Sequence, residues 1–219
     1  MYILNNIILL YILTGKNYKS ERSFKLGFLA SHEGTNVQSI IDGCKSNIIR
    51  AIPSVIISNN SQSGVLQRAK KANIPNYHVS AKQFNNECEL DATILKILQT
   101  HNVNLVILAG YMKKLGDQVL DTYKGNILNI HPSILPKFGG KGMYGDSVHQ
   151  AVLNSGDKKT GVSIHLVTKD YDEGPIIAHT EITLTADETI ESLKKKVQKK
   201  EHQLYIETLR KITFGELIL

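Results

Sequence analysis

Residues 104–130 read NLVILAGYMKKLGDQVLDTYKGNILNI, and this stretch decides the fold. It opens with a continuous apolar run over 104–109, which is typical of a strand covered on both faces. Residues 117–123 then predict a short helix, and a second apolar run over 126–130 predicts another strand. A strand, a helix and a strand in this order predict parallel strands joined by a helical crossover.

The same alternation extends to both sides of this unit. Further strands are predicted over 24–30, 51–57, 75–79, 162–168 and 175–183, and helices over 61–72, 91–101, 145–154 and 187–211. One more helix follows the first strand, where Val37, Ile40, Ile41 and Cys44 recur at helical spacing. We therefore predict an α/β fold with an open, mostly parallel, twisted sheet, helices on both faces, and a single domain over 24–219.

The composition is that of an ordinary soluble globular protein of 219 residues, with 26 Lys and Arg against 20 Asp and Glu. The net charge of +6 fits nucleic acid or a small phosphorylated ligand, but excess lysine on a solvated face explains it best. The cysteines, Cys44 and Cys88, are isolated in the sequence. They predict no zinc motif or disulfide framework and are expected to be small buried side chains.

Residues 1–23 stand apart from this pattern. The apolar run over 1–13 is too short to span a bilayer comfortably, and it lacks the basic start and cleavage site of a secretory signal. An organelle-targeting leader, a dispensable extension and an upstream start codon all fit the stretch. The expected location is the cytoplasm, or an organelle stroma or matrix if residues 1–23 are a leader.

A glycine turn follows the first predicted strand, in Ser31-His-Glu-Gly34-Thr35-Asn36. A strand, a glycine turn and a helix N-terminus aim unpaired N–H groups and the positive end of the helix dipole at one spot, which suits a phosphate. The single glycine matches neither a Walker A loop nor a full dinucleotide fingerprint. A simple turn capped by Thr35 or Asn36 therefore fits the segment equally well.

The clearest chemical motif is Asn129-Ile-His131-Pro132-Ser-Ile-Leu-Pro136, at the carboxyl end of a predicted strand, where open α/β sheets bind ligands. Asn129 and His131 are two residues apart and so face the same side of an extended backbone. An amide donor and an imidazole that converge there would stabilise an oxyanion on a carbonyl under attack. A single strand-end histidine is more often bonded to a loop carbonyl, but the Asn–His pair favours the oxyanion role.

A second polar cluster lies further along the chain. Ser163 and His165 share one face of a predicted strand, and Asp172 lies in the turn before Gly174-Pro175, where a short acid is common for local reasons. A functional Asp172 would orient and charge His131 or relay a proton through water, although the spacing alone does not pair the two.

The last predicted helix begins with Thr185-Ala-Asp-Glu188, which has the pattern of a capping box. Its inward stripe, spaced by three and four residues, comprises Ile190, Leu193, Val197, Leu204 and Thr208. Glu201 falls on this stripe, where a carboxylate needs partners such as an arginine, a helix N-terminus or the hydroxyls of a sugar ligand. Gln198 lies one step around the helix, in a position to line the same site.

Together these motifs resemble those of the phosphoribosylglycinamide formyltransferases, a folate-dependent formyltransferase family of purine synthesis. The matching segments, in order along 24–212, are Gly34-Thr35-Asn36, Leu108-Ala-Gly110-Tyr-Met112, the motif from Asn129 to Pro136, Ser163-Ile-His165 with Asp172, and Gln198 with Glu201-His202. The motif from Asn129 to Pro136 alone is shared by the wider folate-dependent formyltransferase group. Several motifs in matching order are a stronger signal than any one of them.

The resemblance implies transfer of the formyl group of 10-formyltetrahydrofolate to the amine of glycinamide ribonucleotide, without a metal ion. It implies catalytic roles for Asn129, His131 and Asp172, which would stabilise the tetrahedral intermediate and move its proton. The residues it assigns to the ribonucleotide are Gly34, Thr35 and Asn36 at the phosphate, Glu201 at the ribose, and Gly110, Pro132 and Gln198. The residues it assigns to the pterin of the folate are Met112, Lys113, Leu115, Thr168 and Asp172.

Two segments depart from the pattern of the family. Glu87 occupies a position where some members carry an arginine near the folate, so the glutamate tail of the folate would be held differently. The loop Phe138-Gly-Gly-Lys-Gly-Met-Tyr-Gly145 is longer than in some members and is expected to fold over the substrate.

Three alternatives compete with this interpretation. A methionyl-tRNA formyltransferase shares the Asn–His–Asp chemistry but needs a further tRNA-binding domain, and a formyltetrahydrofolate deformylase usually carries a regulatory domain before the core. Intact Asn129, His131 and Asp172 disfavour a non-catalytic nucleotide-binding module. We expect small-molecule partners, neither nucleic acid nor a membrane, and a monomer or homodimer.

Overall fold

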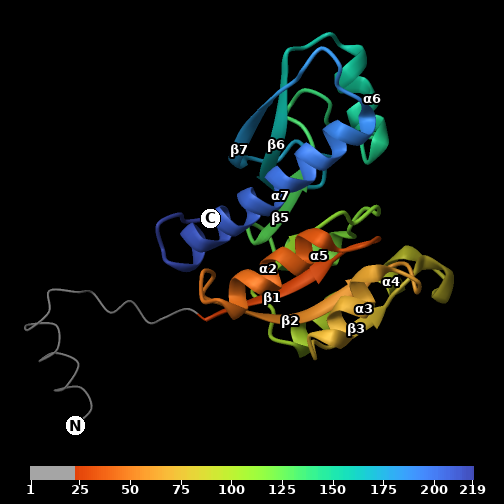
Figure 1. Cartoon of the computed structure of the whole chain (residues 1–219). Helices are drawn as coiled ribbons and strands as arrows, with labels where there is room; N and C mark the ends of the chain where they lie inside the picture. The colour runs from red at the N-terminus through yellow and green to blue at the C-terminus, as the bar shows by residue number, and fades with distance from the viewer. Residues whose placement is uncertain (1–22) are drawn as a thin grey trace, which may run out of the picture.

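A seven-stranded mixed sheet forms the centre of the computed structural model, which describes residues 23–219 (Figure 1). Its strands are β1 (Phe24–Leu29), β2 (Ala51–Ser58), β3 (Asn76–His78), β4 (Leu105–Leu108), β5 (Ile127–His131), β6 (Lys159–Leu166) and β7 (Ile176–Thr183). The helices are α2 (Thr35–Lys45), α3 (Gly64–Lys71), α4 (Glu87–Thr100), α5 (Asp117–Thr122), α6 (Asp146–Asn154) and α7 (Ile190–Thr213), with a short 3₁₀ helix, η1 (Ala81–Gln83). Except for Ser23, the predicted N-terminal extension lies outside the described residues.

The strands lie in the order β3-β2-β1-β4-β5-β6-β7 across the sheet. The pairs β1–β2, β1–β4, β2–β3 and β4–β5 are parallel, as expected where helices join successive strands. β6 and β7 extend the sheet in antiparallel pairing. The prediction of an open, mostly parallel α/β sheet is confirmed.

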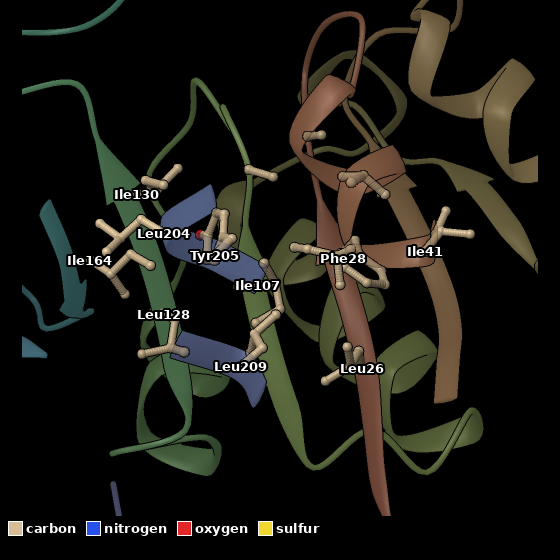
Figure 2. Close-up of a cluster of buried hydrophobic side chains, with 14 of the residues drawn as sticks. Leu26, Phe28, Ile41, Ile107, Leu128, Ile130, Ile164, Leu204, Tyr205 and Leu209 are labelled. Atoms are coloured by element: carbon tan, nitrogen blue, oxygen red, sulfur yellow. The ribbon is translucent and has the colours of Figure 1, made fainter. Parts of the chain in front are cut away.

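Two hydrophobic clusters, one on each face of the sheet, hold the helices in place. Successive residues of a strand point to opposite faces, so on β4 Ile107 joins one cluster and Val106 joins the other. α2, α3, α6 and α7 cover the first face, where Leu204, Tyr205 and Leu209 of α7 pack on the central strands (Figure 2). α4 and α5 cover the second face. Helices on both faces were predicted from the sequence, and this prediction is confirmed.

α7 packs along β6 and β7 and reaches α2, so it connects the two ends of the first face (Figure 1). It begins later than the sequence predicted, because Thr189 is its N-cap and Ser192 is the capping-box partner. The predicted box from Thr185 to Glu188 is wrong. There the Glu188 N–H donates to Thr185 O in a turn, and the Glu188 carboxylate binds Ser192 and Lys196.

The prediction of two buried cysteines is also wrong. Cys88 is exposed because it lies in the first turn of α4, where residues 87–89 face solvent, and Cys44 is only half-buried. None of the helices within residues 23–219 combines the length and apolar character that crossing a membrane requires.

Candidate active site

Three segments meet at the carboxyl ends of the parallel strands. β1 leads into the turn at Gly34, β4 leads into the loop 110–116, and β5 ends at His131. β1 and β4 lie side by side although β2 and β3 intervene in the chain, and open α/β sheets bind ligands outside such a switch point. The segments that carry the predicted chemistry therefore reach one edge of the sheet.

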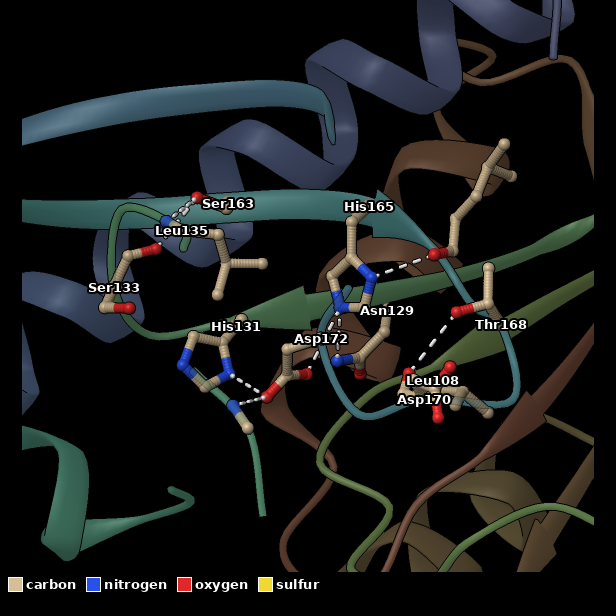
Figure 3. A network of polar contacts seen from close by, with 12 residues as sticks. Leu108, Asn129, His131, Ser133, Leu135, Ser163, His165, Thr168, Asp170 and Asp172 are labelled. Carbon is tan, nitrogen blue, oxygen red and sulfur yellow. Dashed lines mark hydrogen bonds and ion pairs between the residues drawn. The ribbon is translucent and has the colours of Figure 1, made fainter. Parts of the chain in front are cut away.

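His131 and Asp172 lie together at this edge (Figure 3). His131 Nδ1 is 3.5 Å from Asp172 Oδ2. His131 is only 3% exposed, so water screens little of the attraction between its ring and the carboxylate. The structure thus brings together two residues that sequence spacing alone does not pair.

The glycine-rich loop 138–145 contacts both members of this pair. His131 Nε2 donates to Phe138 O at 2.7 Å, and the Gly140 N–H donates to Asp172 Oδ2 at 2.9 Å. Phe138 has a φ of 59°, a conformation that a bulky side chain adopts only when its surroundings impose it. His131 therefore makes both contacts that the sequence left open, a hydrogen bond to a loop carbonyl and a contact with Asp172.

His165 completes the cluster. In the antiparallel pairing of β5 with β6, Asn129 lies opposite His165. His165 Nδ1 donates to Leu166 O at 2.9 Å, which leaves its Nε2 to accept from Asn129 Nδ2 at 3.0 Å. His165 Nε2 is also 3.4 Å from Asp172 Oδ1, so the carboxylate lies between two imidazoles (Figure 3). An amide group carries two donor hydrogens, so Asn129 keeps one for a ligand.

The electrostatics of the pair work in opposite directions. Burial lowers the pKa of His131, and the charge of Asp172 opposes that shift. Burial alone would raise the pKa of Asp172, but the charge of His131 and the hydrogen bond from the Gly140 N–H oppose it, and the pKa lies below its usual value. Asp172 is therefore ionised at neutral pH and is the group that favours a proton on His131.

Gly34 forms the turn between β1 and α2. Its φ is 69°, and an added Cβ would lie 2.4 Å from Val65 Cγ2, so the turn requires glycine. No side chain among the described residues 23–219 caps α2, and its first turn carries no acid, so a cap by Thr35 or Asn36 is not what the structure contains. The N–H groups at the start of α2 are the kind of donors that bind an anion.

Residues of α7 meet this turn from the other side. Asn36 Nδ2 donates to Glu201 Oε2 at 3.0 Å, and Gln198 Nε2 donates to Thr35 Oγ1 at 3.2 Å. Burial raises the pKa of Glu201 to about 7, and the bond from Asn36 opposes that shift. Asn36 Oδ1 is buried without a partner within residues 23–219, which leaves an acceptor for a ligand.

The residues predicted for the pterin are less closely grouped. Met112 N donates to Ser31 Oγ at 2.8 Å, and Lys113 is exposed. The Leu115 side chain packs in the cluster beneath α4 and α5, so Leu115 offers only its backbone to a ligand. Thr168 is exposed and donates to Asp170 O at 3.3 Å.

A cavity of about 350 Å³ adjoins Asp172. Its walls are the turn after β5 and the turn before β7, with Leu135, Pro136, Gly139, Gly140, Tyr171, Asp172, Glu173, Gly174 and Ile176 as lining residues. Of the residues predicted for the folate, only Asp172 lines it. Gly110, with a φ of 73°, and the half-buried Pro132 lie outside its walls, in the segments after β4 and β5.

The sequence profile of the formyl transferase family matches residues 24–209. The chain belongs to the formyl transferase family. It is similar to phosphoribosylglycinamide formyltransferase of Haemophilus influenzae, with 37% identity over 89% of this chain and 90% of that protein. The protein of the same name from Bacillus subtilis is 34% identical over 86% of this chain and 94% of its own length. Among solved structures, glycinamide ribonucleotide transformylase 1 from Symbiobacterium toebii matches with a TM-score of 0.86 and 34% identity, over 94% of this chain and 95% of that one. The family predicted from the motifs is confirmed.

Sequence reasoning left two features of this formyl transferase without a role. The sequence places His165 on a strand face with Ser163 and in a segment that matches the family, but it assigns no role to a residue that orients Asn129 and contacts Asp172. The signal that finds it is the antiparallel register of β5 and β6, which periodicity does not supply. The contact of Phe138 O with His131 has no sequence signal, because it depends on a backbone conformation that favours other residues.

Proposed function

We propose that this protein transfers the formyl group of 10-formyltetrahydrofolate to the amine of glycinamide ribonucleotide. The observation that carries the proposal is the Asp172 carboxylate between His131 and His165, next to Asn129, at the ligand-binding edge of the sheet. An amide donor, a buried imidazole and an ionised acid are the groups that acyl transfer to an amine requires. The names of the similar proteins support the choice of acceptor.

The ribonucleotide occupies the edge between α2 and α7 in this proposal. The N–H groups of Gly34, Thr35 and Asn36 take its phosphate, because the start of α2 has no side-chain cap. Glu201 takes the ribose hydroxyls, and Gln198 closes the site beside Thr35. The unpartnered Asn36 Oδ1 fits this reading, since an incoming hydroxyl or N–H would satisfy it.

The folate lies on the other side of His131. Met112, Lys113 and Leu115 border it from the loop after β4, and Thr168 and Asp172 border it from the turn before β7. Gly110 and Pro132 lie between the two substrates, where the amine meets the formyl carbon. Lys113 is exposed and offers a cation to the acidic tail of the folate.

The chemistry follows from the charges of the site. The amine attacks the formyl carbon, and the carbonyl oxygen becomes an oxyanion. It accepts from the free Asn129 N–H and from the Nε2–H of protonated His131, which exchanges Phe138 O for the oxyanion. Asp172 stabilises that proton on His131. The proton leaving the amine passes through the Asp172–His131 pair to the folate nitrogen as its bond to carbon breaks, which gives formylated ribonucleotide and tetrahydrofolate.

The nearest alternative is hydrolysis, in which water replaces the amine. The test supplies purified protein with 10-formyltetrahydrofolate, with and without glycinamide ribonucleotide, and follows folate absorbance and formate. The proposal expects tetrahydrofolate only when the ribonucleotide is present. Formate release without the amine would identify a hydrolase and refute it.

The proposal also covers the setting of the reaction. We expect turnover without an added metal ion, small molecules rather than nucleic acid or a membrane as partners, and a monomer or homodimer in the cytoplasm or in an organelle. Mass spectrometry of the native protein tests the oligomeric state and shows whether residues 1–23 are retained.

A further inference from the structure

The loop 110–116, here called the folate loop, joins β4 to α5 and carries Met112, Lys113 and Leu115. It contains neither a helix nor a strand, so regular backbone hydrogen bonds do not fix its shape. A binding loop of this kind keeps its geometry only if side chains from the scaffold hold it. Buried polar side chains contact it at both ends.

Ser31 holds the beginning of the folate loop. It is 3% exposed and its hydroxyl accepts from Met112 N at 2.8 Å and donates to Asn59 Oδ1 at 2.6 Å. The Ser31 N–H also donates to Gly110 O at 3.0 Å. This contact ties the folate loop to the turn that carries the proposed phosphate site, so Ser31 serves both substrates.

Asp91 of α4 holds the end of the folate loop. It is 5% exposed, and its Oδ2 accepts from the Gln118 N–H at 2.7 Å, just inside α5. A Cβ added to Gly116 would lie 2.2 Å from Asp91 Cγ and 2.4 Å from Oδ2. The φ of Gly116 is −80°, which any residue adopts, so glycine is required here only because the loop backbone packs directly on the carboxylate.

A carboxylate at this position is costly. Its neighbours on α4, Ile94 and Leu98, point into the apolar cluster of that face, and Asp91 Oδ1 is buried with no partner within residues 23–219. Taking a carboxylate out of water costs free energy that hydrogen bonds must offset, and the Gln118 N–H reaches only one of the two oxygens. Asp91 therefore contributes to the conformation of the folate loop rather than to the packing of the hydrophobic core.

We propose that Asp91 is a positioning residue for folate binding, which fixes the folate loop through Gln118 and Gly116 without touching either substrate. The proposal rests on the proposed function for the identity of the ligand. Asp91 also lies near Tyr111 of the same loop, where its negative charge adds to burial in keeping that hydroxyl protonated. One buried group thus acts on the loop at two points.

The test compares variants on both sides of the contact. Asp91→Ala removes the acceptor, Asp91→Asn keeps an acceptor of the same shape, and Gly116→Ala pushes the loop away from an intact Asp91. Leu98→Ala is the matched control, because it removes a buried side chain from the same helix and cluster at a position that lies against Gly27 of β1.

We expect Asp91→Ala and Gly116→Ala to raise the KM for 10-formyltetrahydrofolate about tenfold, with the KM for the ribonucleotide within about twofold and kcat within about threefold of wild type. Asp91→Asn should restore most of the folate KM. An unchanged folate KM, equal rises in KM for both substrates, or an equal rise in the folate KM of Leu98→Ala would each overturn the proposal.

A second readout does not depend on the reaction. Lys113 and Lys114 are exposed trypsin sites in the folate loop. Asp91→Ala and Gly116→Ala should accelerate cleavage there about tenfold in the substrate-free protein, whereas Asp91→Asn and Leu98→Ala should not. If the loop loosens but wild-type protein shows no formyl transfer, the proposed function fails while the role of Asp91 in the loop stands. If cleavage is unchanged, the role of Asp91 fails whatever the activity.

Discussion

Replacing Glu201 by glutamine should make the substrate-free protein more stable, and the gain should grow with pH. Within residues 23–219 the carboxylate of Glu201 has one donor, Asn36 Nδ2 at 3.0 Å, and burial raises its pKa from 4.5 to about 7. Folding therefore favours the protonated form of Glu201. Its contribution to the stability of the protein is fully present below pH 4.5, the pKa in the unfolded chain, and is lost as the pH rises through the folded pKa near 7. Glutamine keeps the acceptor for Asn36 and carries no charge at any pH.

The size of the effect follows from the shift. A change in pKa of this size corresponds to a free-energy difference of about 3 kcal/mol between the two protonation states. The Glu201 side chain is only half-buried, so screening by solvent makes the effect on the free energy of unfolding smaller than this difference. We expect a gain of about 1–3 kcal/mol at pH 8.5 and almost none at pH 4.5. For a domain of this length, that gain raises Tm by about 3–10 °C.

The assay is thermal unfolding of wild type and Glu201→Gln across this pH range. Glu207→Gln on the same helix is the control, because Glu207 is exposed, paired with Lys211, and has a pKa below its usual value. The control should lose a few tenths of a kcal/mol at most, at high pH. A Tm difference for Glu201→Gln that is the same at both ends of the pH range, or that is negative at high pH, would refute the reasoning.

The remaining predictions concern the reaction and its substrates. His131→Ala and Asp172→Asn should each lower kcat about a hundredfold or more, with smaller effects on substrate binding, and steady-state kinetics measures both. A loss of substrate binding with kcat preserved would contradict the assigned roles. In Asp172→Asn the pKa of His131 should fall further below its usual value, because the negative charge that opposes the lowering by burial is gone. NMR titration of the imidazole ring measures this pKa, and an unchanged value would count against the prediction. Gly34→Ala should raise the KM for the ribonucleotide at least tenfold and cost about 1–3 kcal/mol of stability, since the new Cβ meets Val65 at a positive φ. Steady-state kinetics measures the KM and calorimetry measures the stability. A KM equal to that of the wild type would oppose this prediction.

The sheet was predictable because its strands carry strong local signals. The apolar run at 104–109 and the turn after the first strand identify a parallel sheet and its ligand-binding edge without any tertiary information. The boundary of α7 was not, since Thr185 and Glu188 match the capping-box sequence, whereas the box that forms, Thr189 with Ser192, does not match it. Local signals therefore specify the elements better than their ends.

The candidate site divides in the same way. Asn129, His131 and Glu201 were identifiable from strand and helix periodicity, because each depends on which face of one element it occupies. His165 and Asp91 were not, since their roles arise from contacts between elements far apart in the chain. The pairing of Asp172 with His131 came from family resemblance, because a turn residue with a positive φ has no periodic signal.

The central claim is that the cluster of Asn129, His131 and Asp172 transfers a formyl group to a ribonucleotide amine. A single-turnover experiment with formyl-labelled 10-formyltetrahydrofolate and an excess of glycinamide ribonucleotide tests it most directly. The account predicts that wild-type protein moves all of the label into the ribonucleotide, and that Asp172→Asn does so at least a hundredfold more slowly although it still binds both substrates. Label recovered as formate, or equal rates in the two proteins, would contradict it.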